Sequence, residues 1–225
     1  MKKFLLIMLS VILLSVSLAG CGNRKGEPTP TGFTDPNTGI EYYDVTPKGL
    51  FAVSAGEKYI TVKNGETETD YYEVQFESPE KFLCYEDNGE FLLVRAKDVE
   101  EPTLATFNPV AAFIYDDSNK VFITNFFADN EYLPDELKEH NPTEDTWLCK
   151  MIVEYLVNGE EANISDSEVL RDDMFYIRLL SQKYPGLYYN VVFFGTANGR
   201  YFLADRATGK IVYAPNDIIV RMVGG

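Results

Sequence analysis

The sequence predicts an α+β protein built mainly from antiparallel β-strands, and three observations lead to this prediction. Short apolar runs alternate with turn sequences through residues 40–127. Two stretches between residues 141 and 185 show helical spacing of apolar residues, and short strands return after residue 187. With 225 residues, 45% of them hydrophobic and 24% charged, the composition is that of a folded protein and excludes a disordered or polytopic membrane chain.

Residues 40–127 predict three successive antiparallel β-hairpins and no helix. Each hairpin consists of two apolar runs around a group of turn residues. An Asn-Gly pair between apolar runs favours a tight hairpin, because both central residues of a type I′ turn need positive φ. The runs are 59–62 and 71–76 around Asn64-Gly65, 82–85 and 91–94 around Asn88-Gly89, and 111–115 and 121–127 around residues 116–119.

The middle of the chain predicts two helices. Asn141-Pro142 supplies an N-cap and a proline at the first helical position, apolar residues recur at helical spacing from Trp147, and Asn158-Gly159 ends the first helix. A second helix is expected from the capping box at residues 165–168 to Pro185-Gly186. Its apolar face consists of Leu170, Met174, Ile177 and Leu180, with Tyr184 as a further candidate.

The last forty residues predict an antiparallel meander. Its strands are expected at 187–194, 201–204, 211–214 and 218–223, joined by turns at Asn198-Gly199 and Thr208-Gly209. The order of helix followed by a four-stranded meander resembles that of cystatin-like and NTF2-like rolls. This resemblance of topology implies a fold and no function.

The N-terminus has the layout of a secretory signal. Lys2 and Lys3 precede an apolar stretch over residues 4–18 that is short for a membrane span. The stretch ends in Leu18-Ala19-Gly20-Cys21, which resembles the lipobox of bacterial lipoproteins. The resemblance covers only the first tenth of the chain. It implies that residues 1–20 are a signal peptide that is removed, and that Cys21 becomes the lipidated first residue of the mature protein.

The expected location of the mature protein follows from this resemblance. Lipid on Cys21 would anchor it to the cell membrane, facing the extracytoplasmic side, without crossing the bilayer. Residues 21–39 are rich in Gly, Pro, Thr and Asn and are predicted to form a flexible tether. Residues 40–225 are predicted to form a single integrated α+β domain, with a β-rich part at 40–130 and a second part at 131–225 as its two halves.

The charge of the chain excludes one class of partner. The whole sequence has a net charge of −15, and removal of residues 1–20 takes away two lysines, which leaves −17. Nucleic-acid binding depends on clustered Lys and Arg, and this chain has no such cluster. No nucleic-acid partner is therefore expected.

The residue types that carry catalysis are few. His140, the only histidine, lies just before a predicted helix N-cap, where it is interpreted as a solvated side chain. Cys84 and Cys149 lie in apolar runs, and their interpretation as buried thiols is favoured. Two alternatives stay open, a disulfide between them and a catalytic thiol that works with His140. The acidic clusters match no calcium loop and are interpreted as solvated surface, with a bound Ca²⁺ as the alternative and no other cofactor expected. No catalytic residue is assigned, and a non-enzymatic role is favoured.

The chain is unusually rich in aromatic residues, with 15 Tyr and 15 Phe, several of them in adjacent pairs. Neighbours on a strand point to opposite faces, so such pairs place rings on both sides of a sheet. Exposed tyrosines suit recognition of proteins and stacking on sugar rings. The candidate ligand-surface aromatics are Tyr43, Tyr72, Tyr188 and Tyr189.

These observations favour a membrane-anchored lipoprotein that acts as a binding or interaction module. The ligand would be a glycan, a cell-wall fragment or another envelope protein. Two alternatives remain open at this point: a hydrolase of envelope polymers that uses a carboxylate pair, and a structural accessory of an envelope assembly.

Overall fold

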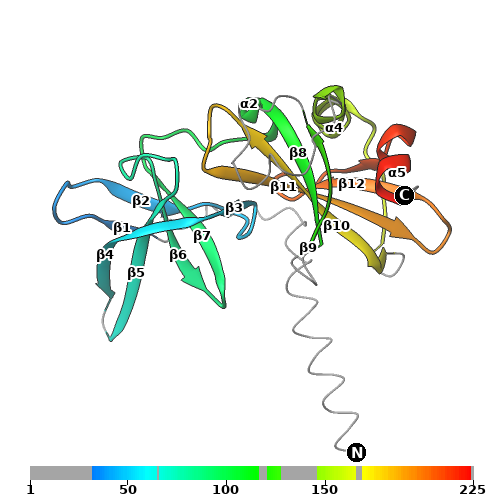
Figure 1. Ribbon diagram of the computed structural model, residues 1–225. Coiled ribbons are helices and arrows are strands. Elements are labelled where there is room, and N and C mark those ends of the chain that lie inside the picture. Colours follow the sequence, from blue (N-terminus) through cyan, green and yellow to red (C-terminus); the bar gives the residue numbers. More distant parts are fainter. Residues whose placement is uncertain (1–31, 65, 117–120, 128–145, 166–168, 224–225) are drawn as a thin grey trace, which may run out of the picture.

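The computed structural model describes residues 32–64, 66–116, 121–127, 146–165 and 169–223. Within these residues the protein is α+β and mostly antiparallel β-structure, as the sequence predicts. A six-stranded sheet lies beside a seven-stranded sheet, and three short helices lie along the seven-stranded one (Figure 1).

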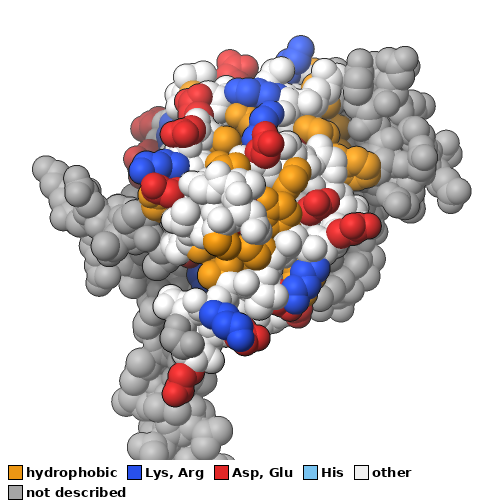
Figure 2. All heavy atoms as spheres, turned by 90° about the vertical axis from the view of Figure 1, so that its left-hand side faces the viewer, with side chains coloured by type: hydrophobic (Ala, Val, Ile, Leu, Met, Phe, Trp, Pro, Cys, Tyr) orange, Lys and Arg blue, Asp and Glu red, His pale blue; other side chains and the backbone are white. Residues whose placement is uncertain are grey.

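The six-stranded sheet has the order β1-β2-β7-β6-β5-β4, with antiparallel neighbours throughout. It curls until its edge strands approach each other. The Tyr59 hydroxyl of β4 donates to Asp35, next to β1, at 2.8 Å, and the ring of Phe33 in β1 lies 4.2 Å from that of Tyr71 in β5. Figure 2, viewed from this side, shows apolar side chains flanked by charged ones. The strands are β1 (Gly32–Thr34), β2 (Glu41–Asp44), β4 (Ala55–Asn64), β5 (Thr67–Val74), β6 (Phe82–Asp87) and β7 (Glu90–Ala96).

The seven-stranded sheet has the order β13-β12-β11-β10-β8-β9, and β3 pairs with β11 beside this path. Residues Phe51–Val53 of β3 pair with Leu187–Tyr189. Only Ser54 separates β3 from β4, so one continuous segment of chain belongs to both sheets. The strands are β3 (Phe51–Val53), β8 (Pro109–Asp116), β9 (Val121–Phe127), β10 (Val169–Ser181), β11 (Leu187–Thr196), β12 (Tyr201–Asp205) and β13 (Ile211–Tyr213).

The three helices are α2 (Leu104–Phe107), α4 (Thr146–Asn158) and α5 (Asn216–Val223). The single turn α2 begins with a reciprocal capping box between Thr103 and Thr106 and ends at Asn108, which adopts the left-handed conformation at φ 50°. The hydroxyl of Ser181, at the end of β10, donates to the carbonyl of Phe107 and ties α2 to the sheet.

One apolar core joins the two sheets. Phe82 and Cys84 of the six-stranded sheet belong to the same buried cluster as Phe107 of α2, Ile152 of α4 and Phe193 of β11. Burial of this cluster supplies the main driving force for the contact between the sheets. The side chains that alternate with Phe193 along β11 point to the opposite face, which is turned away from α2 and α4.

The three predicted hairpins are confirmed, but the prediction of no helix in residues 40–127 is wrong, because Leu104–Phe107 form α2. A single turn is too short to show a helical period in the sequence. Strands β4 and β5, β6 and β7, and β8 and β9 pair in the expected order. In the middle hairpin both turn residues have positive φ, 54° at Asn88 and 83° at Gly89, as a type I′ turn requires. The third hairpin lies in the seven-stranded sheet, so the predicted boundary between the halves at residue 130 does not match the sheets. Apart from β3, all strands up to β7 belong to the six-stranded sheet and all strands from β8 onward belong to the seven-stranded sheet.

The second predicted helix is wrong. Residues 169–181 form β10, a long strand between β8 and β11. Its apolar residues lie on both faces, and such a run produces matches at helical spacing as well as at strand spacing. The aromatic and β-branched residues Phe175, Tyr176 and Ile177 favour a strand, and pairing with two neighbours decides the outcome.

The last predicted strand is also wrong, because residues 216–223 form α5. Six apolar-rich residues are too few for periodicity to separate helix from strand. The helix signals are Pro215 before it, Asp217 in its first turn and Arg221 in its last. The other meander strands are confirmed as β11, β12 and β13, and α4 ends at Asn158 as predicted, while its predicted N-cap lies outside the described residues.

Part of the predicted tether is folded. Residues 32–34 form β1 and pair with β2, and residues 35–39 form the turn between them. The sequence Asp35-Pro-Asn-Thr-Gly39 has the composition of a linker and equally that of a tight turn. The rest of the predicted tether, residues 21–31, and the signal peptide lie outside the described residues.

Two hairpin turns share one arrangement around a buried aspartate. In each, the carboxylate accepts hydrogen bonds from the N–H two residues on, from the threonine hydroxyl three residues on, and from a tyrosine on another strand. Burial raises the pKa of Asp35, but its hydrogen bonds outweigh that effect and hold the pKa below the ordinary 3.8. The donors are Asn37, Thr38 and Tyr59 for Asp35, and Ala207, Thr208 and Tyr189 for Asp205.

Candidate functional site

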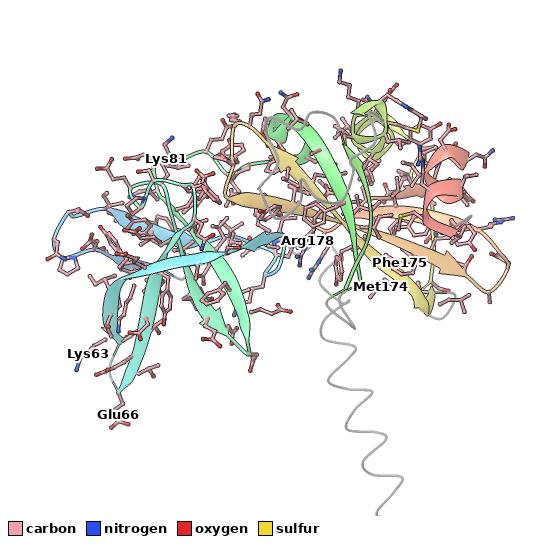
Figure 3. All side chains as sticks on the ribbon, in the orientation of Figure 1. Lys63, Glu66, Lys81, Met174, Phe175 and Arg178 are labelled. Carbon is pink, nitrogen blue, oxygen red and sulfur yellow. The ribbon has the colours of Figure 1, made fainter. Side chains whose placement is uncertain are left out.

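A cavity of about 230 Å³ lies at the junction of the two sheets. Its walls come from β3, from the hairpin between β6 and β7, from β10 and β11, and from the turn after β12. Figure 3 shows Arg178 of β10 beside β3, on the side of the seven-stranded sheet turned away from α2 and α4. The lining side chains with chemical character are Glu90, Phe91, Tyr176, Arg178, Asn190 and Arg206.

Arg206 is held at the cavity by two backbone carbonyls. Its Nη2 donates to the Lys48 carbonyl at 3.1 Å, and its Nη1 donates to the Gly49 carbonyl at 3.2 Å. Gly49 has φ 72°, a backbone conformation that residues with a side chain rarely adopt. A Cβ at this position would lie 3.1 Å from Arg206 Nη1. Glycine at this position therefore lets the backbone approach the guanidinium. Among the described residues, no carboxylate forms an ion pair with Arg206.

Asn190 is fixed to the same loop. Its backbone N–H donates to the Leu50 carbonyl at 2.9 Å, and its Nδ2 donates to the Gly49 carbonyl at 3.0 Å. The residue is 7% exposed, and its Oδ1 has no hydrogen-bond partner within the described part of the chain. Buried acceptors of this kind are uncommon, because an unsatisfied polar group costs about 1–3 kcal/mol.

The side chains that line the cavity carry more positive than negative charge, whereas the whole protein is acidic. Two arginines and one carboxylate line it, in a chain whose net charge is −15. Its lining residues include no Ser, Thr, Cys or His, and Glu90 is their only carboxylate within the described ranges. The arrangement can bind an anion and a hydrogen-bond donor, and the carboxylate pair expected of a glycosidase is not what lines this cavity.

The four predicted surface tyrosines are not brought together. Tyr43 is partly exposed, and its hydroxyl donates to Glu41 at 2.6 Å, which raises the pKa of Tyr43. Tyr188 is partly exposed, with its ring 5.7 Å from that of Phe113. The two residues lie on different sheets.

The other two tyrosines differ in their relation to the cavity. The ring of Tyr72 lies 5.7 Å from that of Phe91, so Tyr72 packs against a residue of the cavity wall. Tyr189 is 0% exposed, and its hydroxyl donates to Asp205 at 2.6 Å. A surface role for Tyr189 is therefore wrong: it lies on the face of β11 that joins the core.

The two thiols belong to the core. Cys84 and Cys149 are buried, and no disulfide joins them. Burial raises the pKa of each to about 12. Thiols with such a pKa stay protonated at neutral pH and are poor nucleophiles. His140, the imidazole considered with them, lies outside the described residues.

The described residues contain no group of three or more His, Cys, Asp or Glu side chains placed to hold a metal ion. They also contain no helix with the length and hydrophobicity needed to cross a membrane.

Comparisons of this chain with protein-family models, with curated proteins and with solved structures find no match. The residues of the cavity therefore carry the functional argument by themselves.

Sequence reasoning missed the cavity residues, although two of them left a signal. Arg178 interrupts the apolar run of β10, and Asn190 interrupts that of β11. The two residues are cross-strand partners. Polar residues inside apolar strands are uncommon in cores and often mark a site, but the prediction of a helix over residues 165–185 concealed this pairing.

Proposed function

We propose that this protein is a lipid-anchored, extracytoplasmic binding module whose ligand site is the cavity between its two sheets. One observation carries the proposal: an acidic protein places two arginines and a buried asparagine around a concave site. Concave sites with a few convergent polar groups are the usual places for small ligands. The lining described above contains no Ser, Thr, Cys or His and no pair of carboxylates, which favours binding over catalysis.

The experiment that tests the site is a thermal-unfolding panel on the full-length lipidated protein in detergent micelles. Its members are amino acids, peptides, mono- and oligosaccharides, wall fragments and Ca²⁺. A ligand at a hundred times its dissociation constant stabilises by about 2.7 kcal/mol, which raises the unfolding midpoint by several degrees at most.

A variant of the cavity shows whether the ligand lies there. Ala52 lines the cavity, whereas Ala207 lies on an exposed turn. Ala52→Leu should abolish the shift because the larger side chain occupies the site, and Ala207→Leu should leave it intact. A panel without any shift, or a shift that Ala52→Leu preserves, would refute the proposed site.

The membrane anchor has its own test. We expect Cys21→Ser to abolish incorporation of a fatty-acid analogue, because the serine hydroxyl cannot form the thioether that the resemblance to lipoproteins implies. Labelling of cells and mass analysis of the purified chain measure this. Cys84→Ala is the matched control and should retain the label, since Cys84 is buried in the core. Label that persists in Cys21→Ser would contradict the anchor.

The finer fold assignment is also a proposal. We infer that α4 and the meander β10 to β13 form a roll of the cystatin or NTF2 kind. The order of helix followed by four antiparallel strands supports this assignment, and so does the burial of α4 in the same cluster as β11 and β12.

A further inference from the structure

We infer that the cavity recognises a carboxylate with an adjacent N–H donor, as found in a free amino acid or in the last residue of a peptide. This inference rests on the proposed function and specifies its ligand class. Three features of the site lead to it: a guanidinium at the rim, an unsatisfied acceptor in the wall, and a small volume.

The guanidinium of Arg206 supplies the anion-binding side. A guanidinium carries five N–H donors in a planar fork that matches a carboxylate. Two of the donor nitrogens contact the carbonyls of Lys48 and Gly49, which orient the plane without neutralising its charge. Arg178 adds a second positive charge to the lining. A ligand carboxylate would therefore meet an oriented cation in an otherwise acidic protein.

Asn190 supplies an acceptor for a hydrogen-bond donor of the ligand. Its Oδ1 accepts no hydrogen bond from the described residues, while its Nδ2 is already bound to the Gly49 carbonyl. An N–H from the ligand would satisfy this acceptor. Because Arg206 and Asn190 contact the same carbonyl of Gly49, the cation and the acceptor lie on neighbouring sides of one loop.

This combination discriminates between ligand chemistries. A phosphate offers acceptors to Arg206, and its protonated oxygen can donate to Asn190 Oδ1, but its other oxygens are acceptors that the Glu90 carboxylate repels. A neutral sugar leaves the charge of Arg206 without a counter-ion. A carboxylate beside an N–H satisfies both sides at once.

The volume limits what enters. About 230 Å³ is below the roughly 300–1,000 Å³ of sites that enclose drug-sized ligands. A free amino acid would enter whole, whereas a peptide would insert only its C-terminal end. Capture of a terminal carboxylate is a recurring mode of peptide recognition.

Calorimetric titration of the full-length protein in detergent tests the inference with four probes: alanine, N-acetyl-alanyl-alanine, the amide of that peptide, and inorganic phosphate. At least one of the first two should bind, and the amide should bind at least about tenfold more weakly than the free carboxylate. Arg206→Gln should weaken the carboxylate ligands at least about tenfold. Arg200→Gln removes the same charge from a turn outside the cavity and should change nothing.

The variant Glu90→Gln distinguishes a free amino acid from the C-terminal end of a peptide as the ligand. A free amino acid carries an ammonium that the Glu90 carboxylate would attract, so this variant should weaken alanine. The acetylated peptide has no ammonium and should bind Glu90→Gln at least as well as it binds wild type.

Equal binding of the peptide and its amide, or tighter binding of phosphate, would overturn the inference. The inference would also be overturned if a saccharide stabilised the wild type but not Ala52→Leu, while neither alanine nor the peptide bound. That result would leave the proposed function intact. If no probe in either experiment binds, the proposed function fails as well.

Discussion

Phe107→Ala is expected to lower the free energy of unfolding by about 3–5 kcal/mol. Phe107 is 0% exposed and packs against three aromatic rings. It stacks on Tyr184 with ring centres 5.8 Å apart, and it lies 5.5 Å from Tyr189 and 6.0 Å from Phe51. Truncation would leave a cavity where α2, β3 and β11 meet, and the single turn of α2 has no other large ring with which to fill it.

Urea unfolding of the full-length protein, followed by circular dichroism, measures this loss. Phe76→Ala is the matched control, since Phe76 is 73% exposed and its removal should change stability by no more than about 0.5 kcal/mol. A cost below about 1 kcal/mol for Phe107→Ala would show that α2 does not anchor the core.

Asp205→Ala is expected to cost at least about 2 kcal/mol of stability. The Asp205 carboxylate accepts hydrogen bonds from Tyr189, Ala207 and Thr208, at 2.6, 3.0 and 2.8 Å. Its removal would leave the Tyr189 hydroxyl buried without an acceptor and would release the turn that carries Arg206. The same urea experiment measures the cost, and Tyr189→Phe should recover part of it in the Asp205→Ala background.

The matching turn at Asp35 is the control. Its tyrosine donor, Tyr59, is partly exposed and can turn to water, so Asp35→Ala should cost less than Asp205→Ala at neutral pH. Because hydrogen bonds lower the pKa of Asp35, the ionised carboxylate stabilises the fold above its ordinary pKa of 3.8. This contribution is lost as the pH falls through the lowered pKa, so the cost of Asp35→Ala should shrink in acid. Equal costs for both variants at neutral pH would contradict the role assigned to the buried Tyr189 hydroxyl.

Local signals predicted the elements whose structure is decided locally. The turn at Asn88-Gly89 needs positive φ at both residues, and the sequence states this need directly. Helix α4 also ends at Asn158, before Gly159, without a positive φ at either residue. Gly159 is needed there for another local reason, since a Cβ on it would lie 2.3 Å from the Tyr155 carbonyl oxygen. Such elements carry their boundaries in a few neighbouring residues.

Elements decided by distant partners were predicted incorrectly. Strand β10 pairs with β8 and β11, and neither pairing is visible in a window of a dozen residues. Within that window Leu170, Met174 and Ile177 match a helix, while Phe175, Ile177 and Leu179 match a strand face. The buried position of Tyr189 follows from the same pairing, because it fixes which side of β11 meets the core.

The candidate site was beyond prediction for a related reason. Its lining comes from five separate segments of chain, and only the fold brings Gly49, Asn190 and Arg206 together. The one signal available was a polar residue at the same level in two neighbouring apolar strands, Arg178 and Asn190. That signal has meaning only after the strands are known to pair.

The position of β3 has a consequence for the order in which the protein acquires its site. Gly49 and Asn190, whose hydrogen bond closes the wall of the cavity, are 141 residues apart in the chain. A contact of such long range is slow to form and cannot form before most of the chain has been synthesised. The curled six-stranded sheet involves residues 32–96 alone and can be complete while β3 still lacks its partner. The walls of the cavity therefore come together only after most of the chain has been synthesised, so binding at the proposed site would report that β3 and β11 have paired.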